Sequence, residues 1–167
     1  VLEGKADVTD AAQLSALLDE IKTTMPPLRG LIHAAMVLDD GLARDLTPER
    51  MRTVLGPKIQ GAWNLHMLTC GMDLDFFVLF SSATTIVGNP GQANYVAANC
   101  HLEALARLRK ALGLPGLALA WGAIDDVGYL ARNQGVKQAL TARLGRTLTA
   151  AEALDAMERL LTGELPV

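Results

Sequence analysis

The sequence predicts an α/β domain built around a parallel sheet. Three short apolar runs, at residues 28–36, 74–82 and 115–122, alternate with longer segments whose apolar residues recur at helical spacing. Strands that alternate with helices in this way pair in parallel, and the helices cover the sheet. No internal repeat or low-complexity tract argues for another architecture.

Length, composition and charge narrow the class of protein. A chain of 167 residues is one domain or a large part of one, and 50% apolar with 20% charged residues is an ordinary globular composition. The net charge of -3 offers no basic surface for nucleic acid or membranes, and neither a transmembrane-length apolar run nor a signal-peptide pattern occurs. We therefore expect a cytoplasmic protein that binds neither nucleic acid nor membranes.

No metal site is predicted. Cys70 and Cys100 have no metal-ligand spacing and are expected to be reduced thiols. His33, His66 and His101 are scattered, without a second ligand at metal-site spacing, so each is expected to pack or to lie at the surface.

The first predicted helix lies within residues 7–24. Thr9 or Asp10 has the character of an N-cap, and the proline pair at 26–27 ends the helix. The run 28–36, "LRGLIHAAM", follows as a buried strand.

After a loop over residues 37–46, a long helix is predicted over residues 47–70. Thr47 is its cap and Pro48 its first helical residue. The Gly-Pro pair at residues 56–57 predicts an irregularity in its middle.

The clearest strand is 74–82, "LDFFVLFSS", in which β-branched and aromatic residues end in small polar ones. A loop over 83–91, a helix over 92–113 that ends at Gly113, and a strand over 115–122 come next.

The last third of the chain is less regular. Residues 125–146 are polar and predict an irregular helical excursion, whereas 147–163 predict a capped amphipathic helix. Residues 1–2 resemble the end of a strand and 164–167 the start of another, so both ends are expected to lie within a larger sheet. The G-x-G-x-x-G dinucleotide fingerprint is absent from the chain.

Polar residues with catalytic potential follow the predicted strands. Ligands of open α/β sheets bind beyond the carboxyl ends of the strands, where Ser81, Ser82 and residues 121–125 lie. Tyr95 and Asn99 are four residues apart and therefore share one face of a helix.

Tyr95 becomes a useful acid when its pKa is lowered. The ordinary tyrosine pKa of about 10 is too high for efficient acid catalysis at neutral pH. The positive end of the helix dipole and an ammonium such as Lys58 both favour the phenolate. A carbonyl held by Ser82 and Tyr95 could then accept a hydride while Tyr95 donates the proton. Each residue alone also fits a structural role, and only the joint spacing favours catalysis.

The motifs resemble those of the ketoreductase domain of type I modular or iterative polyketide synthases, within the short-chain dehydrogenase/reductase superfamily. The strongest is "LFSSATTIVGNPGQANYVAAN", whose serine, glycines, glutamine, tyrosine and asparagine fall in step with the family. "GPKIQGAWNLH" resembles the segment with the catalytic lysine, and "HAAM" resembles the turn beside the cofactor, with Met36 where glycine is usual. "DVTD", "VLDDG" and "LAWGAID" resemble further family segments.

The resemblance implies a Rossmann-like, doubly wound parallel sheet that is incomplete, because the strands around the cofactor loop are absent. The whole chain, 1–167, would be the C-terminal part of one ketoreductase domain. Its parts would be a catalytic core over 1–124, a lid-like segment over 125–146, and the last helix with the start of a strand over 147–167.

The resemblance also implies roles for four side chains. Tyr95 would be the general acid, Ser82 would bind the carbonyl, Lys58 would lower the tyrosine pKa, and Asn99 would support the proton relay. Most of the superfamily places lysine four residues after the tyrosine and asparagine on the preceding helix. This chain has the exchanged arrangement typical of polyketide ketoreductases.

By the same resemblance the cofactor is NADPH and the substrate is a β-ketoacyl thioester. The substrate would be carried on the phosphopantetheine arm of an acyl carrier protein during polyketide or fatty acid assembly. Further partners would be other synthase domains, including the remainder of the same ketoreductase domain. The residues expected to bind the cofactor are Asp7, Val8, His33, Ala34, Ala35, Trp121 and Gly122.

The configuration of the product is predicted from the same family. Residues 38–40 match the Leu-Asp-Asp motif of B-type ketoreductases, which give the D-hydroxyl. Val87 stands where A-type domains carry tryptophan, and Ala97 stands where an epimerising subtype carries proline. The residues expected to contact substrate or set its configuration are Leu38, Asp39, Asp40, Val87 and Gln92.

Three alternatives remain open. The chain could belong to a free-standing short-chain reductase, although the lysine–asparagine exchange argues against it. It could be a non-catalytic structural half of a ketoreductase, although a scaffold does not need the four catalytic side chains. It could also be a truncated segment without activity of its own.

Overall fold

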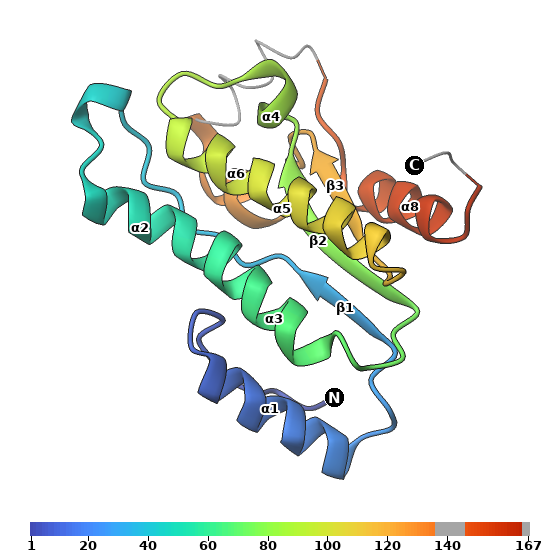
Figure 1. Cartoon of the computed structure of the whole chain (residues 1–167). Helices are drawn as coiled ribbons and strands as arrows, with labels where there is room; N and C mark the ends of the chain where they lie inside the picture. The colour runs from blue at the N-terminus through green and yellow to red at the C-terminus, as the bar shows by residue number, and fades with distance from the viewer. Residues whose placement is uncertain (136–145, 165–167) are drawn as a thin grey trace. The chain divides into compact units, whose positions relative to one another are not determined.

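The computed structural model describes residues 1–135 and 146–164 and divides the chain into two compact units, Val1–Leu119 and Ala120–Val167. The elements follow the predicted order of helix, strand, helix, strand, helix, strand, helix (Figure 1). Strands β1 (Gly30–His33), β2 (Phe76–Ser82) and β3 (Leu117–Trp121) form one parallel sheet in the order β1-β2-β3. The predicted Rossmann-like fold class is confirmed for this part of the domain.

The register of β1 against β2 is fixed by a close approach at Gly30. Gly30 is paired with Phe76, and a Cβ at Gly30 would lie 2.1 Å from the Phe76 ring. The aromatic ring therefore covers the glycine, and the two strands run in parallel from this pair to the pair of His33 with Leu79. This register brings the carboxyl ends of both strands to the same edge.

Helix α1 (Ala11–Thr24) begins where the sequence predicts it. The Asp10 side chain caps it by accepting hydrogen bonds from the backbone N–H groups of Ala12 and Gln13. The hydrophobic face of α1 buries Leu14 against the core.

The predicted irregularity at the Gly-Pro pair is a π-helical turn. Helix α2 (Pro48–Gly56) is followed directly by η2 (Pro57–Gly61) and then by α3 (Ala62–Thr69). Pro57 has no backbone N–H, so the regular hydrogen-bond ladder cannot pass through it, and a wider turn results. Lys58 in this turn is only 2% exposed.

Two predictions at loops and ends differ from the structure. The predicted loop 83–91 contains a single helical turn, α4 (Thr84–Val87), because the Ser82 hydroxyl accepts from the Thr84 N–H and starts a turn there. Residues 1–2 form no strand, since they pair with none of the strands in the described part of the chain.

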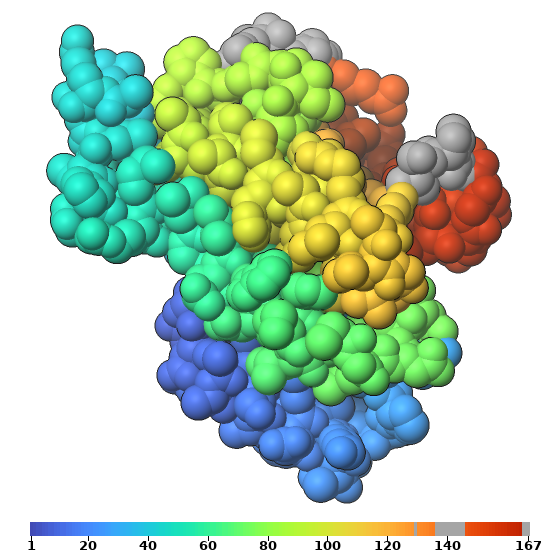
Figure 2. Space-filling view, viewed as in Figure 1, coloured from blue at the N-terminus to red at the C-terminus, as the bar shows by residue number. Residues whose placement is uncertain are grey.

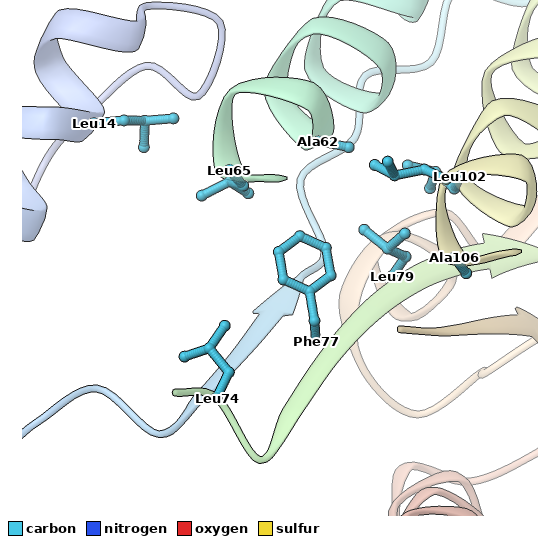
Figure 3. Packing of buried hydrophobic residues seen from close by; sticks show 9 residues of the cluster. Leu14, Ala62, Leu65, Leu74, Phe77, Leu79, Leu102 and Ala106 are labelled. Carbon is cyan, nitrogen blue, oxygen red and sulfur yellow. The ribbon is translucent and has the colours of Figure 1, made fainter. Parts of the chain in front are cut away.

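The hydrophobic core of the first unit lies between the sheet and the helices α1, α3 and α5 (Ala93–Ala111) (Figure 1). Helices α3 and α5 form part of the outer surface on the side seen in Figure 2. Phe77 and Leu79 point from β2 toward Leu65 of α3 and Leu102 of α5 (Figure 3). Phe77, Val78 and Leu79 are fully buried in succession, so β2 is covered on both faces.

The second unit contains α6 (Gly128–Arg132) and α8 (Ala150–Leu161). Thr149 and Glu152 form a reciprocal capping box at the start of α8, which confirms the predicted cap. An isolated parallel bridge joins Ile124 to Leu148. The predicted lid-like segment 125–146 falls partly, and the predicted terminal strand 164–167 mostly, outside the described residues.

Truncation of a core side chain should destabilise the first unit strongly. Leu79→Ala removes a fully buried side chain and should lower the free energy of unfolding by about 2–5 kcal/mol. Leu112→Ala, at a 58% exposed position, is the matched control and should change it by less than about 0.5 kcal/mol. Chemical denaturation measures both, and equal losses would contradict the assigned core.

Candidate active site

Lys58 is buried between the π-helical turn and strand β2. Its ammonium Nζ donates a hydrogen bond of 2.8 Å to the backbone carbonyl of Phe80 and lies 5.5 Å from the centroid of the Tyr95 ring. Burial lowers the pKa of Lys58 from 10.5 to about 8. The Lys58 charge thus lies beside the tyrosine, although burial disfavours the charged form of the amine.

His33, predicted to lie beside the cofactor, is a buried group at the end of β1. Its Nε2 lies 3.0 Å from the carbonyl oxygen of Pro57, so Nε2 carries the proton and donates. Burial, and secondarily the charge of Lys58, lower the pKa of His33 to about 4. A neutral His33 therefore links β1 to the π-helical turn at physiological pH.

Ser82 ends β2, and its hydroxyl is oriented by the following turn. The Ser82 Oγ accepts from the Thr84 backbone N–H at 3.3 Å and from the Thr84 hydroxyl at 3.1 Å. A serine hydroxyl has two acceptor positions and one donor. With the acceptor positions used, the Ser82 O–H is left to donate, which is what a carbonyl-binding hydroxyl requires.

Tyr95 lies in the first turn of α5, where the sequence predicts it. Burial raises the pKa of its phenol, and the charge of Asp40 adds to this, whereas the side chains of Asn99 and Ser82 lower it. The net direction is upward, so the expected lowering of the Tyr95 pKa by Lys58 is not found. Burial of the phenol is the main cause, and the Lys58 ammonium, which donates to the Phe80 carbonyl, does not offset it in the pKa of Tyr95.

Met36 contacts the tyrosine directly. The Tyr95 hydroxyl lies 4.0 Å from the Met36 sulfur, and Met36 itself is 39% exposed. The residue that departs from the family pattern is therefore next to the predicted acid.

Asn99 is fully buried one turn after Tyr95. Its Nδ2 donates to the Tyr95 backbone carbonyl at 2.9 Å, whereas its Oδ1 has no hydrogen-bond partner among the described residues. An unpaired buried acceptor is costly, so Oδ1 is available to accept from a water or a ligand hydroxyl.

The Leu-Asp-Asp segment is held to the helices by a network of ion pairs and amides. Arg50 of α2 forms a bidentate pair with the Asp39 carboxylate, with the shortest contact at 2.6 Å, and also donates to the Asp40 carbonyl. Gln92 Nε2 donates to the Asp40 carboxylate at 2.9 Å, and Asn94 Nδ2 donates to the Asp39 carbonyl. The segment is thereby fixed against the start of α5 beside Tyr95.

The remaining predicted residues are more dispersed. Leu38 is half-buried, and Val87 on α4 is 61% exposed. Ala34 and Ala35 follow β1 directly. Trp121 is the last residue of β3 and Gly122 follows it, and both belong to the second unit.

Asp7 and Val8 lie before α1. The exposed Asp7 carboxylate accepts from the Thr9 N–H and hydroxyl, and both bonds use Oδ1, so Oδ2 can accept from a ligand amine or hydroxyl. The Val8 carbonyl accepts from Asn64 of α3, which ties this segment to the first unit.

Sequence reasoning missed four residues that support the site, namely Arg50, Thr84, Asn94 and Glu103. Glu103 had a signal, because positions 95, 99 and 103 continue the four-residue spacing along one helix face. Arg50 and Asn94 had none, since their partners lie in the Leu-Asp-Asp segment, far from them in the sequence. Thr84 bonds to the Ser82 hydroxyl two residues away, a local contact that was missed because a loop was predicted there.

Neither a metal site nor a membrane-spanning helix is found in the described residues. No group of three or more His, Cys, Asp or Glu residues there could hold a metal ion. None of the helices described is both long and apolar enough to cross a membrane.

The comparisons with known proteins decide the family. The sequence profile of the KR domain matches residues 1–126. The chain belongs to the ketoreductase (KR) domain family of polyketide synthases. The predicted resemblance to this family, within the short-chain dehydrogenase/reductase superfamily, is therefore confirmed.

The curated relatives of this KR chain are much larger proteins, and the chain matches only a small part of each. It is 50% identical over 141 residues to polyketide synthase GfsB of Streptomyces halstedii, which covers 84% of the chain and 2% of the synthase. It is 42% identical over 165 residues to phenolphthiocerol synthesis polyketide synthase type I Pks15/1 of Mycobacterium bovis, covering 96% of the chain and 8% of the synthase.

Solved ketoreductases share the fold of this KR chain. A structure described as an A1-type ketoreductase superimposes with a TM-score of 0.86 at 36% identity, over 93% of this chain and 33% of that one. The KR chain thus spans only a third of that ketoreductase and a small part of the synthases.

The burial of Lys58 predicts a pH-dependent stability. Between pH 8 and 10.5 the unfolded chain keeps a proton on Lys58 that the folded chain has lost, so the free energy of unfolding rises with pH in this window. Below pH 8 Lys58 is protonated in both states, and the destabilisation caused by its burial is constant. The fall in pKa corresponds to roughly 3 kcal/mol of destabilisation at neutral pH. Lys58→Met should therefore be more stable than the parent at pH 7, and this advantage should shrink toward pH 10.5.

Denaturant unfolding of parent and variant across pH 7–10.5 checks this prediction, because the difference cancels the titrating groups that do not interact with Lys58. Lys110→Met, at an exposed position on α5, is the control and should give a difference that does not change with pH. If the difference in free energy of unfolding between Lys58→Met and the parent were also independent of pH, the lowered pKa of Lys58 would be contradicted.

Proposed function

We propose that this chain supplies the catalytic side chains for reduction of a β-ketoacyl thioester to a β-hydroxyacyl thioester, with NADPH as hydride donor. The substrate is carried on the phosphopantetheine of an acyl carrier protein, within a polyketide synthase. The observation that supports this most is the convergence of Ser82, Tyr95, Lys58 and Asn99 at the carboxyl end of β2 and the start of α5.

Ser82 and Tyr95 are proposed to hold the carbonyl oxygen. The Ser82 hydroxyl has its acceptor positions filled by Thr84 and donates. The raised pKa of Tyr95 keeps its phenol protonated at neutral pH, so it also donates. Two preoriented donors at the oxygen where negative charge develops stabilise the transition state.

Tyr95 then gives its proton to that oxygen. The Lys58 ammonium, 5.5 Å from the centroid of the Tyr95 ring, favours the phenolate formed in this step, although burial of the phenol outweighs it and leaves the Tyr95 pKa raised. Asn99 Oδ1, a buried acceptor without a partner in the described residues, supports a water-mediated return of the proton.

The nicotinamide cofactor supplies the hydride when it is bound. Asp7 and Val8, with the residues that follow β1 (His33, Ala34 and Ala35), would hold it. The accessible acceptor on Asp7 fits an amine or hydroxyl of a dinucleotide. Trp121 and Gly122 are proposed on the nicotinamide side from the family resemblance.

Removal of the Tyr95 hydroxyl should stop the reaction. Tyr95→Phe in a ketoreductase domain that contains this chain should lower kcat by at least about 100-fold, the usual contribution of a general acid. NADPH consumption with a simple β-ketoacyl thioester measures it, and an unchanged unfolding midpoint serves as the control for folding. Unimpaired turnover would sink the mechanism, and a parent domain that binds NADPH without turnover would favour the structural, non-catalytic alternative.

The product should have the D configuration. The Leu-Asp-Asp segment, fixed by Arg50 and Gln92 beside Tyr95, and Val87 in place of tryptophan support B-type stereocontrol. Chiral chromatography of the β-hydroxyacyl thioester checks it. An L product would keep the reductase assignment and remove the stereochemical one.

A further inference from the structure

The carboxylate of Glu103 joins the two sides of the turn that carries Ser82. Its Oε1 accepts a hydrogen bond from the Ser81 hydroxyl at 2.8 Å and lies 2.8 Å from the Thr85 hydroxyl, whose single proton it shares with the Ser82 carbonyl oxygen at 2.9 Å. Ser81 is the last buried residue of β2, at 4% exposure, and Thr85 belongs to α4. A single carboxylate oxygen on α5 therefore holds residues immediately before and shortly after Ser82.

Glu103 lies on the same helix face as Tyr95. Positions 95, 99 and 103 are spaced by four, and α5 is continuous from Ala93 to Ala111. The distance along the helix between the phenol and the carboxylate is therefore set by rigid helical geometry. Through its two bonds the helix that carries the proposed acid also holds the turn that carries the proposed carbonyl-binding hydroxyl.

The contacts that orient the Ser82 hydroxyl are longer than the 2.8 Å contacts made by Glu103. The two contacts that orient the Ser82 Oγ, both from Thr84, are 3.3 and 3.1 Å long. Hydrogen bonds to an ionised carboxylate are about twice as strong as those between neutral groups. The two bonds to Glu103 are the charge-assisted contacts of this turn.

We propose that Glu103 is a positioning residue that fixes the Ser82 hydroxyl relative to Tyr95 through Ser81 and Thr85. This inference rests on the proposed function, since it assigns a role to Glu103 in that same reaction. Glu103 touches neither substrate nor cofactor in this role, and it acts only through Ser82.

Glu103→Ala should lower kcat by about tenfold to a hundredfold, because small misplacements of an orienting group cost this much, and should leave KM within a few-fold. Glu103→Gln keeps an acceptor oxygen for both hydroxyls and should recover most of the activity. Arg107→Ala, at an exposed position one turn further along α5, is the control and should be unchanged.

A double-mutant cycle with Ser82→Ala separates positioning from general structural support. If Glu103 acts through Ser82, Glu103→Ala should cost less than about twofold in the Ser82→Ala background, because coupled residues are not additive. The same fold-loss in both backgrounds would overturn the positioning role.

Amide hydrogen exchange tests the clamp without relying on turnover. Glu103→Ala should speed exchange at residues 81–88 while α5 keeps its protection, and Glu103→Gln should not. Unchanged exchange at residues 81–88 would overturn the proposal. A domain that binds NADPH but reduces no β-ketoacyl thioester would contradict the proposed function alone, and the exchange result would still decide whether Glu103 holds the turn.

Discussion

The site depends on a proline that a helix cannot accommodate regularly. Pro57 has no N–H to donate, and the π-helical turn that begins with it directs Lys58 into the interior. The same residue offers its carbonyl to His33 of β1, while Lys58 offers its ammonium to Phe80 of β2. One irregular turn therefore binds two of the three strands, β1 and β2, near their carboxyl ends and holds a positive charge beside Tyr95.

Helix α5 carries three side chains of the site on one face, because they are spaced at the helical repeat. Tyr95, Asn99 and Glu103 lie on one face at intervals of four residues, and each contacts a different partner. Since the helix is rigid and packs on β2 through Leu102 and Ala106, the phenol, the buried amide and the carboxylate keep fixed positions relative to the strand end. The exchanged positions of lysine and asparagine make sense in this frame, because the ammonium enters from the neighbouring helix.

The helices and strands were predictable from apolar periodicity, and the shared face of Tyr95 and Asn99 from their four-residue spacing, since these are local features. The approach of Lys58 and Ser82 to Tyr95 is not local, and the family resemblance was what implied it. The short helix α4 was missed because it is created by side-chain bonds to Ser82, which compete with the loop conformation. Arg50 was missed because its partners, Asp39 and the Asp40 carbonyl, come together only when the Leu-Asp-Asp segment folds back on α2. The direction of the Tyr95 pKa was wrong because burial is a tertiary property that spacing does not report.

The thioether of Met36 bears on how Tyr95 is presented to a substrate. A glycine here would leave the phenol without this neighbour, whereas Met36 places its sulfur 4.0 Å from the hydroxyl. Sulfur is a weak hydrogen-bond acceptor, so a carbonyl oxygen competes well for the same proton. An unbranched side chain with several rotatable bonds can also move aside at little cost. Met36 beside the hydroxyl is therefore compatible with the proposed role of Tyr95 as the acid, although glycine is the usual residue at this position.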